Sequence, residues 1–160
     1  MSELLNLEPK GLWKHFDKIC SIPHPSKHEE KIVAALVEFA KENNIEYKLD
    51  EVGNVIMRKP ATKGMENRKG VILQAHCDMV PQKNNDVEHD FKKDPIKPRI
   101  VENMVYATGT TLGADNGLGC AVAMAVLESN DLVHGPIEVL ITIDEETGMY
   151  GANDLKAGWL

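Results

Sequence analysis

The chain has 160 residues, enough for one domain with a hydrophobic core, and its hydrophobic fraction of 42% is ordinary for a soluble globular protein. Its 25 acidic and 18 basic residues give a formal net charge of −7. Nucleic acids and anionic membranes bind clustered positive charge, so this balance argues against both as partners. No apolar run approaches the roughly 20 residues that a membrane-spanning helix needs.

The cysteines indicate a reducing compartment. Cys20, Cys77 and Cys120 are odd in number, widely spaced and form no Cys-x-x-Cys pair. The first residues lack the basic and apolar segments of a secretory signal. We therefore expect a cytoplasmic protein without a disulfide framework.

The first third of the chain predicts two helices and a hairpin. Residues 12–20 have a helical apolar pattern, which the prolines of residues 21–25 must end. Ser26 and Glu29 have the spacing of a capping box, and a helix to about residue 43 should follow. Two β patterns, at residues 47–51 and 54–58, flank Gly53 and predict a hairpin.

The rest of the chain alternates strands and helices. Residues 71–75 and 137–143 are apolar and predict strands, the first covered on both faces, and residues 100–107 predict a further strand. Residues 81–98 are polar and predict a surface loop. A small-residue helix is expected at 116–128, and another helix should begin within 151–157. The alternation predicts the α/β class, with a mixed sheet flanked by helices.

Residue types that bind metals occur in three short segments. In an extended chain His76 and Asp78 point to the same side, and a carboxylate commonly fixes the ring of a metal-binding histidine. Asp115 lies in a glycine-flanked turn before a helix, where it could equally be an N-cap. Adjacent carboxylates, Asp144 to Glu146, follow an apolar strand and would repel one another without a cation. A solvated strand end and a solvated acidic turn remain the alternatives for the first and third segments.

A dinuclear zinc hydrolase would account for all three segments. A carboxylate can bridge two metals, which lower the pKa of a shared water, while a second carboxylate transfers the proton to the leaving amine. Glu145 and Glu146 could divide the roles of base and ligand. A nucleotide-binding Rossmann fold does not fit, because no strand precedes a Gly-x-Gly-x-x-Gly turn.

Three longer motifs carry a resemblance to a known family. Residues 21–26 (SIPHPS), 74–84 (QAHCDMVPQKN) and 109–117 (GTTLGADNG) closely resemble bacterial aminoacyl-histidine dipeptidases, cytosolic enzymes that hydrolyse Xaa-His dipeptides such as carnosine. These belong to the wider zinc family of aminoacylases and glutamate carboxypeptidases. The resemblance extends over nearly the whole chain from Leu12 to Leu160.

The resemblance implies roles for the residues singled out above. His76 would bind one zinc ion, Asp115 would bridge two, and Glu146 would bind the second. Glu145 would be the general base and Asp78 would orient His76. It also implies a cis peptide bond between Asp115 and Asn116, and a homodimer for the full-length protein. Cys77, where many relatives have an aliphatic residue, is expected to be a small buried side chain and not a ligand.

The family also implies parts that this chain lacks. Residues 1–160 would form a partial catalytic domain, without the lid domain and the C-terminal half that supply a further acidic ligand and a late histidine. Each zinc would then have only two protein ligands, where catalytic zinc usually has three. We therefore expect the 160-residue chain to fold, to bind metal weakly and not to hydrolyse carnosine. The alternatives are a related aminoacylase or tripeptidase, or a non-catalytic metal-binding module.

Overall fold

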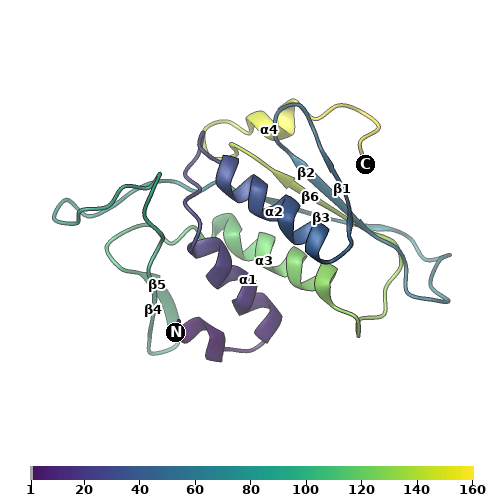
Figure 1. Ribbon diagram of the computed structural model, residues 1–160, viewed down its shortest axis with the longest axis horizontal. Helices are drawn as coiled ribbons and strands as arrows, with labels where there is room; N and C mark the ends of the chain where they lie inside the picture. The colour runs from purple at the N-terminus through teal and green to yellow at the C-terminus, as the bar shows by residue number, and fades with distance from the viewer. Residues whose placement is uncertain (1) are drawn as a thin grey trace.

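The computed structural model describes residues 2–160, which form an α/β fold around a mixed four-stranded sheet (Figure 1). A 3-10 turn, η1 (Glu3–Asn6), leads into helix α1 (Lys10–Cys20), and helix α2 (Glu30–Glu42) follows after the proline-rich break. Helix α3 (Ala114–Glu128) makes the most extensive helix–helix contact, with α1, and also lies against strand β3. The one-turn helix α4 (Tyr150–Asn153) comes after the last strand. None of the helices in residues 2–160 has the length and apolarity to cross a bilayer.

The sheet has the order β1-β2-β6-β3. Strands β1 (Glu46–Leu49) and β2 (Val55–Lys59) form the expected hairpin, and β2 is also antiparallel to β6 (Ile137–Thr142). Strand β3 (Val71–His76) runs parallel to β6, with His76 opposite Thr142. Parallel neighbours end at the same edge of a sheet, so the chain leaving β3 and the chain leaving β6 emerge side by side. The predicted mixed sheet is confirmed.

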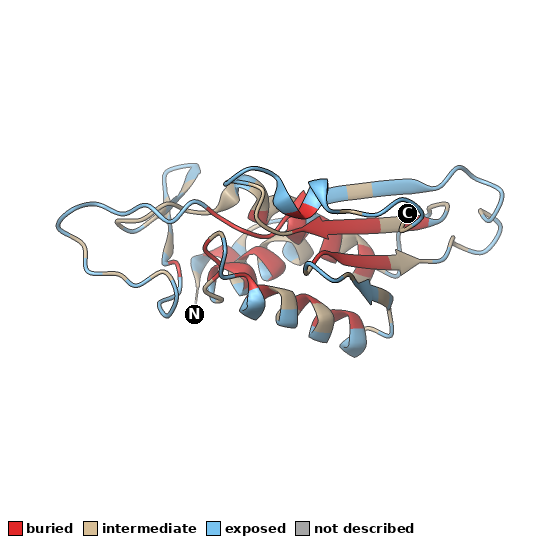
Figure 2. Ribbon diagram, turned by 90° about the horizontal axis from the view of Figure 1, so that it is seen from above, coloured by how far each residue is buried: buried red, intermediate tan, exposed pale blue. Residues whose placement is uncertain are grey.

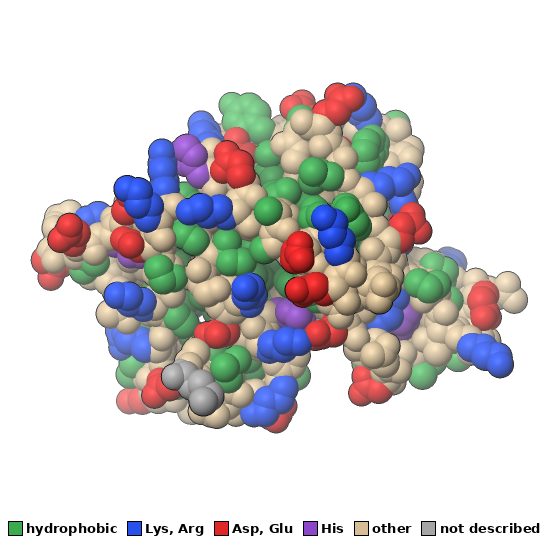
Figure 3. Space-filling model, in the orientation of Figure 1, with side chains coloured by type: hydrophobic (Ala, Val, Ile, Leu, Met, Phe, Trp, Pro, Cys, Tyr) green, Lys and Arg blue, Asp and Glu red, His purple; other side chains and the backbone are tan. Residues whose placement is uncertain are grey.

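The core lies between the sheet and the helices, where the buried residues concentrate (Figure 2). Val55, Met57, Val139 and Ile141 are fully shielded from solvent. Helix α3 lies close to β3 at Gly119: a Cβ added to this residue would lie only 3.3 Å from the Cβ of Ala75. The predicted small-residue helix is present, and its small side chains allow this close approach. On the outside, basic and acidic side chains are interspersed over the face shown in Figure 3.

Four predictions of local structure need correction. Val71 and Ile72 are about half exposed, because β3 is an edge strand within residues 2–160 and not one covered on both faces. Residues 100–107 are not one strand: β4 (Pro98–Val101) and β5 (Met104–Ala107) form a separate hairpin that turns at Glu102, with φ of 54°. The last helix is only the single turn α4. The N-cap of α2 is Glu29 and not Ser26, whose side chain binds elsewhere.

Candidate metal centre

His76 is the last residue of β3 and lies with Asp78 at the edge where β3 and β6 end. Both are buried, and Nδ1 of His76 lies 3.2 Å from Oδ1 of Asp78 and 3.2 Å from its carbonyl oxygen. Two acceptors at Nδ1 hold a ring proton there, so Nε2 is the ring nitrogen that is directed toward other partners. The structure thus brings the carboxylate of Asp78 against the ring of His76. Cys77 points away and is buried, as expected.

Asp115 approaches the ring of His76 from the start of α3. Its Oδ1 lies 3.1 Å from Nε2 of His76, and its side chain is 86% exposed. Asp115 (φ −88°, ψ 107°) and Asn116 (φ −115°, ψ 33°) interrupt the helical geometry at the start of α3, and it is Oδ1 of Asn116 that accepts from the amide of Gly119 at 3.1 Å, so the N-cap interpretation of Asp115 is wrong. The expected cis peptide bond between Asp115 and Asn116 is present.

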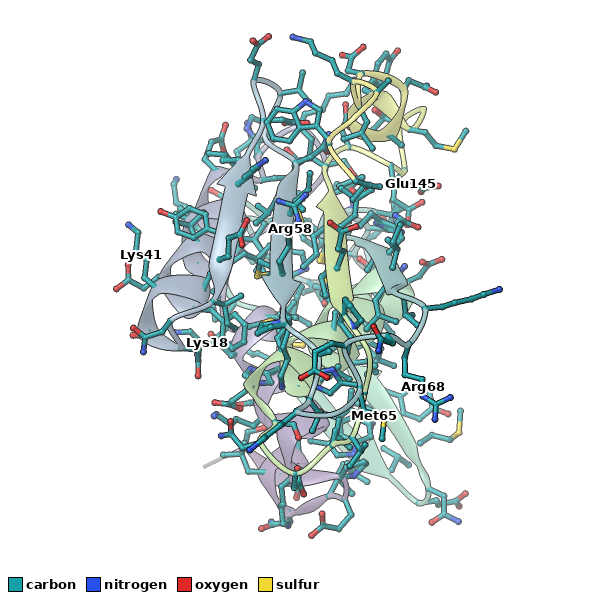
Figure 4. The ribbon with its side chains drawn as sticks, turned by 90° about the vertical axis from the view of Figure 1, so that its right-hand side faces the viewer. Lys18, Lys41, Arg58, Met65, Arg68 and Glu145 are labelled. Carbon is teal, nitrogen blue, oxygen red and sulfur yellow. The ribbon has the colours of Figure 1, made fainter. Side chains whose placement is uncertain are left out.

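Glu145 and Glu146 reach the same place from the end of β6. Asp144 turns the chain with φ of 49°, a conformation uncommon for residues other than glycine. The backbone amides of Glu145 and Glu146 then donate to Oδ1 and Oδ2 of Asp78, at 3.0 and 3.2 Å. Figure 4 shows Glu145 beyond the end of its strand, and Oε2 of this residue lies 3.8 Å from Nε2 of His76.

The three predicted ligands form one group. Each of His76, Asp115 and Glu146 offers a ligand atom, and these atoms all lie within 4.8 Å of one another. An imidazole nitrogen with carboxylate oxygens is a donor set that suits zinc. Nε2 faces two carboxylates, of Asp115 and Glu145, so a metal ion that displaced the Nε2 proton would bind the lone pair and offset the negative charge. These residues fit a metal ion.

The pKa values reflect the concentration of negative charge. Burial alone would lower the pKa of His76, but the hydrogen bond and charge of Asp78, with the nearby Asp115 and Glu145, raise it to about 9. Burial opposes ionisation of Asp78, yet its bonds from His76, Glu145, Ser26 and Glu146 bring its pKa down to about 2. Burial raises the pKa of Glu146, with the neighbouring carboxylates adding to the effect and His76 opposing it. Asp78 is therefore the ionised anchor of the centre.

Some residues around this centre were not predicted as functional. Ser26 donates to Oδ2 of Asp78 at 2.7 Å, Glu29 accepts from the amide of Asp144, and Asn54 accepts from the amide of Ile143. Glu29 and Asn54 are buried polar residues. Glu29 and Asn54 lie more than 80 residues from the residues whose amides they bind, so motif spacing could not identify them as functional.

Comparisons with known proteins agree with this geometry. The family model described as Peptidase family M20/M25/M40 matches residues 72–160, which include all five predicted site residues. The cytosol non-specific dipeptidase of Escherichia coli (strain K12) is 61% identical over 160 residues, covering 100% of this chain and 33% of that protein.

Solved peptidase structures are also similar to this chain. The crystal structure of an aminoacylhistidine dipeptidase from Vibrio alginolyticus is 61% identical with a TM-score of 0.97, over 99% of this chain and 32% of that one. A tripeptidase from Staphylococcus aureus is 26% identical with a TM-score of 0.77, over 94% and 40% of the two chains. The chain thus spans about a third of the length of the two dipeptidases that are 61% identical to it. From its match to the family model over more than half its length, the chain belongs to peptidase family M20/M25/M40.

Proposed function

We propose that the chain carries part of the active centre of a zinc-dependent dipeptidase that hydrolyses Xaa-His dipeptides. The observation that supports this most directly is the grouping of His76, Asp115 and Glu146 within 4.8 Å, beside the free carboxylate of Glu145. The dipeptidase names of the two 61% identical relatives support the substrate class. Because the chain spans a third of those relatives, the activity is proposed for a protein that also contains the remaining parts.

The proposed division of roles follows from where each side chain lies. His76, Asp115 and Glu146 would hold two zinc ions, with Asp115 between them. Asp78 keeps the proton of His76 on Nδ1, so that Nε2 is available as a ligand. When bound, such ions supply Lewis acidity: they polarise the scissile carbonyl and lower the pKa of the attacking water.

Glu145 is the proposed general base. Its amide is held by Asp78 while its side chain, 36% exposed, remains accessible from the sheet edge. A carboxylate in this position can accept the proton of the attacking water and give it to the leaving amine. Its neighbour Glu146 is directed into the ligand group, so two adjacent carboxylates serve two roles.

A chimaera tests the proposal. This chain replaces the corresponding N-terminal third of the E. coli dipeptidase, and the purified protein is assayed with carnosine, other Xaa-His dipeptides, a tripeptide and an N-acylated amino acid, with and without zinc. We expect zinc-dependent hydrolysis of the dipeptides, abolished by His76→Ala. A folded chimaera that binds zinc without cleaving dipeptides would refute the proposed activity, and preference for the tripeptide or the acylated substrate would shift it to a relative of that type.

We also propose a cytoplasmic location and a homodimeric assembly for the complete protein. The three cysteines are free and buried, which is compatible with a cytoplasmic location. A homodimer is proposed for the complete protein, and light scattering of the chimaera after gel filtration measures its mass.

A further inference from the structure

Four consecutive backbone amides at the metal centre are each bound by a side chain. We call residues 143–146 the carboxylate loop. Its amides donate in order to Oδ1 of Asn54 at 3.2 Å, Oε1 of Glu29 at 3.1 Å, and the two carboxylate oxygens of Asp78 at 3.0 and 3.2 Å. All three acceptor residues are buried. The path of the loop is therefore set by side chains from three distant segments.

Glu29 connects the carboxylate loop to the start of α2. Its Oε1 accepts from the amide of Lys27 at 2.9 Å as well as from that of Asp144. Lys27 has φ of 70°, so the turn before α2 directs the Glu29 side chain inward, where the residue is 6% exposed. One carboxylate oxygen thus joins two turns that are far apart in sequence.

The bond to Glu29 falls where the chain changes direction. Asp144 has φ of 49°, and the next two residues are the proposed base and a proposed ligand. A non-glycine residue keeps this conformation only when its surroundings hold it. Rotation at Asp144 would redirect both following carboxylates, whereas catalytic groups need placement within about 0.5 Å.

The hydrogen bonds also account for a second carboxylate group. Oxygens of Glu29, Asp78 and Asp144 lie within 4.8 Å of one another. Glu29 accepts from the amides of Lys27 and Asp144, and Asp78 accepts from the amides of Glu145 and Glu146 and from the hydroxyl of Ser26. Asp144 accepts from the hydroxyl of Thr147. Burial, with the charges of Asp78 and Asp144, raises the pKa of Glu29, and the bonds from amides oppose that rise by favouring the ionised form. The group is therefore explained as an anchor for the loop.

We propose that Glu29 is a positioning residue of the metal centre: by binding the amide of Asp144 it sets the direction in which Glu145 and Glu146 leave β6. The inference rests on the proposed function, because it assigns Glu29 a role in presenting those carboxylates. Glu29 is not one of the grouped residues His76, Asp115 and Glu146, and it acts through its bond to the amide of Asp144.

The test uses the 160-residue chain with three variants. Glu29→Ala removes the acceptor, Glu29→Gln keeps an oxygen at the same position, and Glu30→Ala is a matched control at the next, exposed position. NMR hydrogen exchange of the zinc-free chain follows the amides of the loop and, for comparison, those of β2 and α3. Zinc affinity is measured separately by competition with a chromophoric chelator.

The expected pattern separates positioning from general destabilisation. In Glu29→Ala, exchange of the Asp144 to Glu146 amides should rise about tenfold, as for loss of one hydrogen bond to a charged acceptor, with β2 and α3 unchanged. Zinc affinity should fall by about tenfold, the effect typical of losing a group that orients ligands. Glu29→Gln should restore both values to within about twofold, and Glu30→Ala should change neither.

Other outcomes overturn the inference. Unchanged loop exchange in a folded Glu29→Ala variant removes its basis, and so does a uniform rise in exchange over the whole sheet. Faster loop exchange with unaltered zinc affinity shows that the bond does not position ligands. If the unaltered chain and the chimaera both fail to bind zinc, the proposed function fails instead, while the exchange data still decide whether Glu29 holds the loop.

Discussion

Asp78→Asn tests the anchor of the metal centre, because Asp78 contacts His76, Ser26, Glu145 and Glu146. The carboxylate binds Nδ1 of His76 and the amide of Glu145 through Oδ1, and the hydroxyl of Ser26 and the amide of Glu146 through Oδ2. Asparagine can keep the Oδ1 contacts, but its amide group would then face the N–H of Glu146, placing two donors together.

The magnitude follows from the pKa values. The shift of Asp78 from 3.8 to about 2 corresponds to about 2 kcal/mol in favour of the ionised form. The shift of His76 from 6.5 to about 9 corresponds to about 3 kcal/mol, but Asp115 and Glu145 contribute to it. Both shifts contain the same ion pair, so they are not added, and the value for Asp78 is the better measure. The zinc-free variant should lose about 2 kcal/mol of unfolding free energy at pH 7.

Urea denaturation and zinc competition measure the two consequences. Zinc affinity should fall about 10- to 100-fold, because the tautomer and orientation of His76 are no longer enforced. The control is Asp86→Asn, at an exposed position of the polar loop. An Asp78→Asn chain with unfolding free energy within about 0.5 kcal/mol of the original and the same zinc affinity would refute this account of the centre.

Three further predictions concern chemistry, pH and packing. In the chimaera, Glu145→Gln should lower kcat by about 10²- to 10⁴-fold with little change in zinc affinity, and a parallel loss of zinc would contradict its role as base. Burial lowers the pKa values of His15 and His24, so each destabilises the fold as pH decreases from 7.5 to 5.5, while His76, whose pKa is raised, acts in the opposite sense. The urea midpoint of a His24→Gln chain should therefore rise relative to that of the original chain as pH decreases over this range, and a difference between the two midpoints that stays constant with pH would contradict the effect assigned to His24. Gly151→Ala would place a Cβ 2.5 Å from Oδ1 of Asn54 and should cost about 1–3 kcal/mol in urea denaturation, while Gly70→Ala, with its nearest atom at 3.6 Å, is the control expected to unfold normally.

The sequence pattern correctly predicted those features that depend on residues only a few positions apart. The apolar spacing of residues 12–20 predicted α1, and the alternation of residues in a strand predicted that His76 and Asp78 face the same side. The same alternation placed Cys77 in the core. These properties depend on backbone geometry over a few residues, which the sequence specifies directly.

Ser26 shows where local pattern fails. Its spacing from Glu29 matches a capping box, yet its hydroxyl donates to Asp78, 52 residues further along the chain. The tertiary contact prevails because segment 24–26 runs beside residues 78–79, joined by backbone bonds from Ser26 to Met79 and from Met79 to His24. The hydroxyl donates to an ionised, buried carboxylate, and this charge-assisted bond is stronger than the neutral bond that its oxygen would accept from a backbone amide of the next helix.

The sequence by itself determined the α/β class, most of the helices and strands, and the chemical types that gather at the ends of β3 and β6. Only the tertiary structure decided that Asp115 reaches Nε2 of His76 and that Asn54, Glu29 and Asp78 bind four successive amides. The physical reason is the separation of the partners in sequence: side-chain direction follows from local backbone geometry, whereas contacts across 39 to 115 residues depend on how the whole sheet and its helices pack.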